Sequence, residues 1–238
     1  MSRHAHADAN TAIPADGLTR TSLARLIDHS VLKPESTERD IAAGAAVVRE
    51  WRIGFYCVQM SWVRQAASVL AGTDATVISV VGFPHGCETA TVKAHAAERA
   101  IADGAGEIDM VIDVGLLRSG RAAHVGDGIA SVVRAVEGTP VKVIIEAAAL
   151  TTDEKRLACR LAVDHGAAFV KTSTGFHPAG GATVDDIRLM RACVGPHIGV
   201  KASGGIRTLD DARRMLAAGA NRIGTSASAA ILGALAEN

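Results

Sequence analysis

Aromatic side chains are scarce in this chain of 238 residues, since Phe, Trp and Tyr together make up only 3% of it. Hydrophobic residues nevertheless account for 48%, so we expect a sizeable core built mostly from Ala, Val, Ile and Leu. The 25 Lys and Arg residues balance the 25 Asp and Glu residues, and the formal net charge is zero. Without an overall basic field, the chain lacks the usual electrostatic signature of a nucleic-acid-binding protein.

Long apolar runs are also missing. No stretch is long enough to span a membrane, and the first residues lack the apolar segment of a signal peptide. The cysteines, which are Cys57, Cys87, Cys159 and Cys193, lie far apart and form no C-x-x-C pair. This spacing is typical of free thiols in a reducing compartment. We therefore predict a cytoplasmic protein that has neither a membrane partner nor a nucleic-acid partner.

The length suits one large domain, because a β/α barrel with eight repeats typically takes about 250 residues. Residues 1–20 are polar and rich in Ala, so we expect a flexible tail there and a single catalytic domain over residues 21–238. The tail carries His4 and His6, but two histidines alone make a weak metal site. We therefore expect no bound metal ion.

Glycine marks a repeat along the chain. Gly104, Gly166 and Gly219 each follow an expected helix and precede an apolar segment, and glycine is favoured just past a helix C-terminus. Helices are expected at residues 21–26, 37–50, 61–70 and 88–103, with Thr37 as the cap of the second. The segments between such helices are short, apolar and typical of buried strands.

Eight such strands alternate with helices in one uninterrupted domain. They are expected at residues 26–32, 54–58, 75–81, 107–112, 141–145, 168–172, 197–201 and 222–225. This alternation implies a parallel sheet, and eight repeats favour a closed β/α (TIM) barrel with a short helix before its first strand. No G-x-G-x-x-G motif follows the first strand, which argues against an open dinucleotide-binding sheet.

Lysine is rare here, with six residues against nineteen arginines, yet two lysines occur in matched motifs. Val170-Lys171-Thr172-Ser173-Thr174-Gly175 and Val200-Lys201-Ala202-Ser203-Gly204-Gly205 share the form V-K-x-S-x-G. Their 30-residue spacing equals about one strand–helix–strand step, so we expect both lysines at the ends of neighbouring strands, pointing the same way.

Two ammonium groups held close together repel each other, and the strain is relieved if one of them loses its proton. A neutral amine attacks carbonyl groups and forms a Schiff base, which a permanently charged guanidinium cannot do. Lys171 and Lys201 are therefore candidates for a nucleophile and its neighbour. The alternative is that each lysine forms an ordinary surface ion pair.

Acidic residues also occur on the expected strands. Asp28 lies within the first strand and Glu146 follows the fifth, while Glu107 and Asp109 share one face of the fourth. An acid on so apolar a strand needs a partner if it is buried. Asp109 is therefore either half of a structural ion pair with a lysine or an acid/base group beside the nucleophile.

The turns after the last two strands are rich in glycine and hydroxyl groups. In a β/α barrel, the loops after strands seven and eight often bind phosphate through backbone N–H groups. We expect Gly204, Gly205, Thr225 and Ser226 to form such a site, and Ser226 also to cap the final helix. The alternative is simply a pair of tight turns.

Six motifs, taken together and in order, resemble the deoxyribose-phosphate aldolase family from about residue 26 to residue 226. They are L-I-D-H-S-V-L-K-P at residues 26–34, G-F-P-H-G at 82–86, E-I-D-M-V-I at 107–112, K-V-I-I-E at 142–146, V-K-T-S-T-G-F at 170–176 and V-K-A-S-G-G-I-R at 200–207. The resemblance implies a class I aldolase that needs neither a metal nor another cofactor. Its expected reaction is the reversible cleavage of 2-deoxy-D-ribose 5-phosphate to acetaldehyde and D-glyceraldehyde 3-phosphate, in deoxyribose phosphate catabolism.

The resemblance also implies roles for residues. Lys171 would form the Schiff base, Asp109 would relay protons, and Lys201 would lie beside the Schiff base. Asp28 and Thr172 would join the phosphate-binding residues in contacting the substrate. Small sugar phosphates and acetaldehyde would be the partners, and the family implies a homo-oligomer, a dimer or larger.

This sequence departs from the family pattern at several positions. Gln59 and Met60 replace the usual Asn-Pro after Cys57, Ala147 replaces a common Thr, and Asp113 replaces a common Asn. The chain also ends without the tyrosine tail of some members. These changes bear on rate, substrate range and closure of the C-terminus rather than on the reaction class.

Two other functions fit the sequence. One is a different Schiff-base barrel, such as another sugar-phosphate aldolase or a transaldolase, which product analysis with acetaldehyde as donor distinguishes. The other is an inactive barrel that only binds a sugar phosphate. Such a barrel needs the phosphate loops but neither lysine, whereas both lysines are present here.

Overall fold

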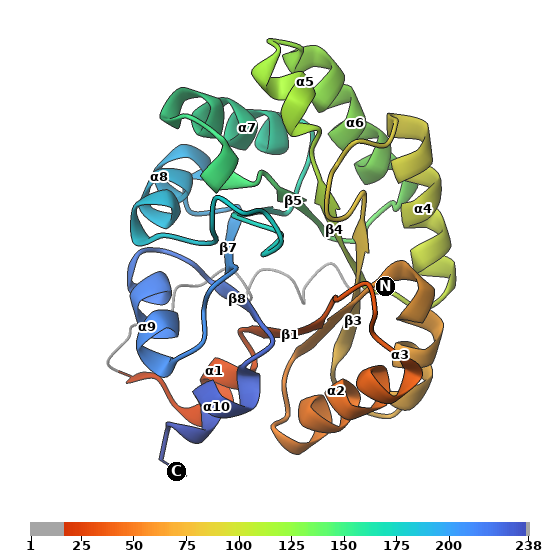
Figure 1. The fold of residues 1–238 in the computed structure, drawn as a ribbon, viewed down its shortest axis with the longest axis vertical. Helices are drawn as coiled ribbons and strands as arrows, with labels where there is room; N and C mark the ends of the chain where they lie inside the picture. Colours follow the sequence, from red (N-terminus) through yellow and green to blue (C-terminus); the bar gives the residue numbers. More distant parts are fainter. Residues whose placement is uncertain (1–16, 237–238) are drawn as a thin grey trace.

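Eight parallel strands close into a barrel in the order of the chain, from β1 to β8 (Figure 1). This computed structural model describes residues 17–236, so the expected tail with His4 and His6 lies almost wholly outside the described residues. The strands are β1 Ile27–Val31, β2 Phe55–Val58, β3 Thr76–Val81, β4 Glu107–Val111, β5 Val141–Ile144, β6 Phe169–Lys171, β7 Gly199–Ser203 and β8 Arg222–Thr225. The predicted TIM barrel is confirmed.

Helices surround the barrel, as Figure 1 shows. The larger ones are α2 Glu38–Glu50, α3 Val63–Val69, α4 Ala90–Ala102, α6 Ala122–Ala135, α7 Thr152–Asp164, α8 Val184–Val194 and α9 Leu209–Ala217. The short ones are α1 Arg20–Ala24, α5 Val114–Arg118, α10 Ser228–Gly233, and the 3-10 turns η3 Met60–Trp62 and η4 Ala147–Ala149. The short helix before the first strand is confirmed, and the Thr19 side chain caps it.

Three local predictions need correction. The helix expected at residues 61–70 begins with the 3-10 turn η3 and becomes α-helical only at Val63. Two helices, α5 and α6, fill the space between β4 and β5, where one was expected. Strand β7 begins and ends two residues later than predicted, because its ladder with β8 continues to Ser203 opposite Gly224. Lys201 therefore lies in the middle of its strand rather than at the end.

The barrel interior is divided into an apolar part and a charged part. One small buried cluster consists of Leu32 just after β1, Cys57 of β2, and Ile78 and Val80 of β3, and it is separate from the large core. Buried charged side chains of the strands come from β1, β4, β5, β6, β7 and β8, and they are Asp28, Glu107, Asp109, Lys142, Lys171, Lys201 and Arg222. TIM barrels usually fill this space with layers of branched apolar residues, so charges here need a specific explanation.

Gly199 makes room for the aromatic ring of Phe169, which lies near buried charged side chains. A Cβ on Gly199 would lie 1.9 Å from Cδ1 of Phe169 on the neighbouring strand, far inside van der Waals contact. The glycine therefore allows the Phe169 ring to lie over the neighbouring strand. This ring lies 5.8 Å from Nζ of Lys142 and 5.4 Å from the Arg222 guanidinium carbon, measured from its centroid.

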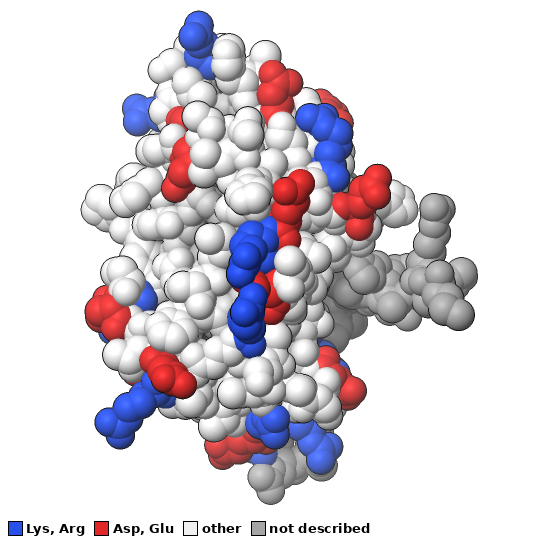
Figure 2. Space-filling view, turned by 90° about the vertical axis from the view of Figure 1, so that its right-hand side faces the viewer, with Lys and Arg blue, Asp and Glu red and all other residues white. Residues whose placement is uncertain are grey.

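The surface carries charges of both signs in small mixed groups with uncharged areas between them, as Figure 2 shows for one face. This pattern agrees with the balanced composition and adds no single-sign patch on that face. Among residues 17–236, no helix is long and apolar enough to cross a membrane.

Candidate active site

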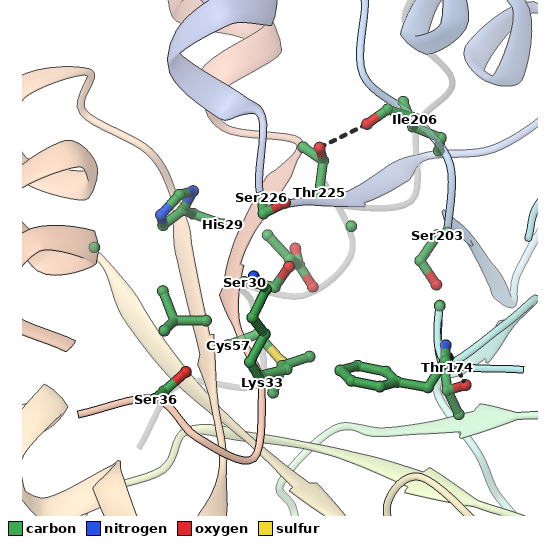
Figure 3. A pocket seen from close by; sticks show the side chains of 18 of the residues that line it. His29, Ser30, Lys33, Ser36, Cys57, Thr174, Ser203, Ile206, Thr225 and Ser226 are labelled. Atoms are coloured by element: carbon green, nitrogen blue, oxygen red, sulfur yellow. Dashed lines mark hydrogen bonds between the residues drawn. The ribbon is translucent and has the colours of Figure 1, made fainter. Parts of the chain in front are cut away.

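A cavity of about 820 Å³ opens at the C-terminal ends of the strands, where TIM barrels carry their active sites. Figure 3 shows labelled side chains from several strand ends and loops around its open centre. Lining residues from the sequence prediction are Asp28, Lys171, Lys201, Gly204, Gly205, Thr225 and Ser226. The structure thus brings together in one cavity most of the residues that the motifs indicated.

Lys171 and Lys201 converge on one carboxylate oxygen. Nζ of Lys171 lies 2.8 Å from Oδ2 of Asp109, and Nζ of Lys201 lies 2.7 Å from the same atom. The two lysines are register partners on β6 and β7, so the prediction that both point the same way is confirmed. Asp109 itself is fully buried and is not among the described residues that line the cavity.

The environment changes the ionisation of all three groups. Burial lowers the pKa of Lys171, and the nearby Lys201 ammonium lowers it further, against the opposing effect of Asp109. Burial would also lower the pKa of Lys201, but the carboxylates of Asp109 and Asp28 raise it above the usual value. The sequence argument attributed the lower pKa of Lys171 mainly to Lys201. That is corrected here, because burial contributes most.

Asp109 stays ionised because its neighbouring ammonium groups outweigh the effect of burial. Burial alone would raise the pKa of its carboxyl group, but the ammonium groups of Lys142, Lys171 and Lys201 hold that pKa well below the ordinary range. A carboxylate that faces three lysines is a strong acceptor of hydrogen bonds and a fixed negative charge beside Lys171. The structure therefore makes it the ion-pair partner of both predicted lysines, Lys171 and Lys201.

Two buried cations were missed by the sequence argument. Nζ of Lys142 lies 2.9 Å from Oδ1 of Asp109 and 2.5 Å from Oε2 of Glu107. The Arg222 guanidinium donates to Oδ1 of Asp28 at 2.7 Å and to Oε1 of Glu107 at 2.8 Å. Both cations are at most 1% exposed, so each depends on these carboxylates for its compensation.

These contacts close into a ring of alternating charges inside the barrel. Lys201 completes it, because its ammonium contacts Asp28 as well as Asp109. Lys171 lies outside this closed set and joins it through an ion pair with Asp109. We call the closed set the charge ring; its members, in order, are Glu107, Lys142, Asp109, Lys201, Asp28 and Arg222.

The loops after β7 and β8 meet at one side of the cavity. Gly204 and Gly205 have φ angles of 88° and 80°, a left-handed conformation that favours glycine. The Thr225 hydroxyl donates to the Ile206 carbonyl at 2.7 Å and so ties the two loops together (Figure 3). The exposed cations Arg207 and Lys33 also line the cavity and were absent from the predicted site.

Two predictions about this region do not agree with the geometry. Thr172 is not among the described cavity-lining residues, because its hydroxyl lies between β6 and β7, donating to the Ser203 carbonyl and accepting from the Ser203 N–H. Ser226 does not cap the last helix, since α10 begins at Ser228 with Ala227 in the N-cap position. Thr172 therefore fixes the spacing of two strand ends, and Ser226 lines the cavity only.

The comparisons with known proteins decide the family. The model of the DeoC/LacD family aldolases matches residues 22–234, which include every member of the charge ring. The chain belongs to this aldolase family. It is therefore an aldehyde-lyase, and the resemblance of its motifs is confirmed.

Individual relatives of this aldolase span most of its length. A deoxyribose-phosphate aldolase from Bacillus mycoides is 50% identical over 188 residues, which cover 79% of this chain and 84% of the relative. A solved protein from Coccidioides immitis is 37% identical, with a TM-score of 0.88 over 91% of this chain and 87% of that chain. A tetrameric deoxyribose phosphate aldolase from Aeropyrum pernix is 27% identical, with a TM-score of 0.85 over 98% of both chains.

Glu146 holds the loop that follows the Lys171 strand of the aldolase. Its backbone has a φ of 52°, which is uncommon outside glycine, and its carboxylate accepts from both the N–H and the hydroxyl of Thr174. Thr174 lines the cavity three residues after Lys171. The strained backbone therefore aims a carboxylate that positions this wall of the site.

Cys57 also lines the cavity of the aldolase, but it is only 1% exposed. Burial, together with the Asp109 carboxylate, raises the pKa of its thiol to about 11. The thiolate is the reactive form of cysteine, so this residue is poorly nucleophilic near neutral pH. Among residues 17–236, no group of three or more His, Cys, Asp or Glu side chains is arranged to hold a metal ion.

Asp109→Asn is expected to lower both turnover and stability. Turnover per folded molecule should fall about 100-fold or more, because the carboxylate that accepts from Lys171 and Lys201 is lost. An acid that served only in catalysis would leave the thermal midpoint almost unchanged when it is replaced. The three ammonium contacts change that expectation, because removing one partner of a buried ion pair costs about 3–5 kcal/mol.

Kinetics normalised to the folded fraction, together with thermal melts, check this prediction. Asp186→Asn is the matched control, because Asp186 pairs with Lys155 outside the barrel and should affect only stability. An Asp109→Asn variant with nearly wild-type turnover per folded molecule would show that Asp109 is purely structural.

Proposed function

We propose that this aldolase reversibly cleaves 2-deoxy-D-ribose 5-phosphate to acetaldehyde and D-glyceraldehyde 3-phosphate through a Schiff base on Lys171. One observation carries the proposal: Lys171 is the buried lysine that lines the cavity and lies outside the charge ring. The name of the Bacillus mycoides relative supports the choice of substrate.

Counting charges supports Lys171 as the neutral amine. The charge ring contains three carboxylates and three cations, so it is balanced without Lys171. The Lys171 side chain is only 3% exposed. If Lys171 were protonated, its positive charge would be buried without a further carboxylate to compensate it. Isolated buried charges are unstable, and the group in question shifts its pKa and becomes neutral instead. Lys171 contacts one of these carboxylates, whereas each cation of the charge ring contacts two, so we infer that Lys171 gives up the proton.

The reaction then follows from ordinary Schiff-base chemistry. The neutral Nζ of Lys171 adds to the C1 aldehyde to give a carbinolamine, which loses water to form an iminium ion. A base takes the proton of the C3 hydroxyl, the C2–C3 bond breaks, and its electron pair moves into the enamine. D-Glyceraldehyde 3-phosphate leaves. Protonation of the enamine at C2 and hydrolysis release acetaldehyde and regenerate the amine.

Asp109 and Lys201 serve the proton transfers in this scheme. Asp109 is not among the cavity-lining residues, so it acts through Lys171 and Lys201, the two of its three lysine partners that line the cavity, or through a water molecule. Lys201 lines the cavity and remains an ammonium group because its pKa is raised by Asp109 and Asp28. It therefore stabilises negative charge that develops on the substrate oxygens.

The phosphate group of the substrate would bind at the loops after β7 and β8. Gly204, Gly205 and Ser226 offer backbone N–H groups and a hydroxyl, and Arg207 adds a positive charge at the rim. Contacts to a phosphate remote from the reacting carbon supply binding energy that helps to orient the aldehyde at Lys171. Asp28 contributes through Lys201 and Arg222 rather than through the phosphate.

Ser226→Glu should abolish most activity on the phosphorylated substrate. The new carboxylate would lie where the phosphate binds and would repel it, whereas unphosphorylated 2-deoxyribose should be much less affected. Comparing kcat/KM for both sugars measures the effect. Ser36→Glu is the matched control, because Ser36 lines the same cavity from the loop after β1. Equal losses on both sugars would rule out a phosphate site at Ser226.

Product analysis tests the proposed reaction itself. We expect 2-deoxy-D-ribose 5-phosphate to yield equal amounts of acetaldehyde and D-glyceraldehyde 3-phosphate, and the two products to recombine in reverse. Formation of dihydroxyacetone or another donor fragment from a different sugar phosphate, without this reaction, would instead indicate another Schiff-base aldolase.

The proposal places the enzyme in deoxyribose phosphate catabolism in the cytoplasm, with small sugar phosphates and acetaldehyde as its partners. It includes a homo-oligomeric assembly, a dimer or larger, which the tetrameric Aeropyrum pernix relative supports.

A further inference from the structure

Arg222 and Glu107 form the lowest part of the charge ring, below the cavity. Neither is among the described residues that line it. Glu107 precedes Asp109 by two residues on β4, which is about 7 Å along a strand. Arg222 is 1% exposed, and its guanidinium carbon lies 3.1 Å from the centroid of the Phe55 ring. Substrate therefore does not reach this pair, yet its charges are buried with the reacting lysine.

Two chains of contacts lead from this pair to Lys171. In one, Arg222 binds Asp28, Asp28 binds Lys201, and Lys201 binds Asp109. In the other, Glu107 binds Lys142, and Lys142 binds Asp109. Both chains end on the carboxylate that accepts from Lys171.

We propose that Arg222 and Glu107 are positioning residues that set, from below the cavity, the pH at which Lys171 becomes a nucleophile. The inference rests on the proposed Schiff-base function. It assigns to these two residues an electrostatic role in that function, in addition to their contribution to folding.

The argument is again one of charge balance. Lys171 is faced by the Asp109 carboxylate from β4, the Lys201 ammonium from β7 and the Cys57 thiol from β2, while β5 presents the apolar Ile144 in register with it. With Lys171 protonated, the buried set has four cations and three carboxylates, an excess of one positive charge. That excess favours loss of the Lys171 proton.

Removing the Arg222 charge and removing the Glu107 charge change this positive excess in opposite directions. Without the Arg222 charge, the set is balanced while Lys171 is still protonated, so the lysine holds its proton more tightly. Without the Glu107 charge, the excess becomes two and the lysine loses its proton more easily. At an effective dielectric constant of about 20, a unit charge about 10 Å away moves a titration by about one pH unit, a tenfold change in the neutral fraction.

The experiment measures the rate of Schiff-base formation with acetaldehyde, trapped by borohydride, as a function of pH. Arg222→Met should move the rising limb of this pH–rate profile to higher pH by about one unit. Glu107→Gln should move it to lower pH by a similar amount. The double variant restores the original excess and should return the limb to its wild-type position. Arg222→Lys keeps the charge and should stay near wild type.

Arg191→Met provides the matched control. Arg191 donates to the backbone carbonyls of Gly219, Gly195 and Ile198, so its loss should destabilise the fold and leave the limb in place. If Arg222→Met does not fold, the direction of the shift in Glu107→Gln decides the question alone. Each variant is compared at matched folded fraction.

Shifts of Arg222→Met and Glu107→Gln in the same direction, an unshifted limb in Glu107→Gln, or a double variant that fails to restore it would overturn the proposal. These outcomes differ from failure of the proposed function. In that case, the wild-type enzyme itself would form no adduct on Lys171.

Discussion

Lys171→Met should lower turnover at least about 1,000-fold, because it removes the nucleophile while keeping the apolar stem of the side chain. The loss should appear in kcat at saturating substrate, since the remaining cavity still binds the sugar phosphate. Without the amine, no iminium ion forms, and the C2–C3 bond has no electron sink.

The same substitution should leave the thermal midpoint unchanged or raise it. Nζ of Lys171 has a contact with Asp109 but lies outside the balanced charge ring, so its removal leaves the charge balance and the contacts within the ring intact. Most substitutions of a buried polar group destabilise, which makes this a distinctive outcome. Lys155→Met is the control, because its ion pair with Asp186 lies outside the barrel and its loss should lower stability without changing kcat. A Lys171→Met variant with a tenth or more of wild-type turnover would contradict the assignment.

Lys201→Leu should move the rising limb of the pH–rate profile to higher pH. The nucleophilic form of Lys171 exists above its pKa, and the Lys201 ammonium holds that pKa down together with burial. Removing the ammonium therefore raises the pKa of Lys171, and each unit lowers the neutral fraction about tenfold at a given pH below the limb. Activity near neutrality should fall, and part of it should return under alkaline conditions.

Lys201→Arg separates charge from geometry. It keeps a cation beside Lys171 and should hold the limb closer to wild type, even if turnover suffers. Both variants disturb the contacts with Asp28 and Asp109, so stability is measured in parallel. A rate that falls equally at every pH in Lys201→Leu would confine Lys201 to positioning substrate or water.

The barrel could be predicted from the sequence because its evidence is local. Alternating helices and apolar strands can be seen within a few dozen residues, and the matched V-K-x-S-x-G motifs correctly predict that Lys171 and Lys201 lie side by side. The start of β7 could not be predicted as well. Gly199 is required by the Phe169 ring on the neighbouring strand, a contact that depends on packing rather than on the local pattern.

The charge ring could not be predicted in the same way. Lys142 and Arg222 begin or precede apolar runs and look like solvated strand ends, and nothing nearby in the chain indicates their partners. Asp28 and Arg222 are 194 positions apart and meet only because β8 closes the barrel against β1. The large effect of burial on Lys171 likewise depends on the finished barrel around it.

The proposed function depends most directly on where the covalent bond forms. The deciding measurement is mass spectrometry of peptides after treatment of the enzyme with acetaldehyde and borohydride. The reduced two-carbon adduct should lie on the peptide that contains Lys171, and Lys171→Met should carry none. An adduct on Lys201 instead would contradict the account.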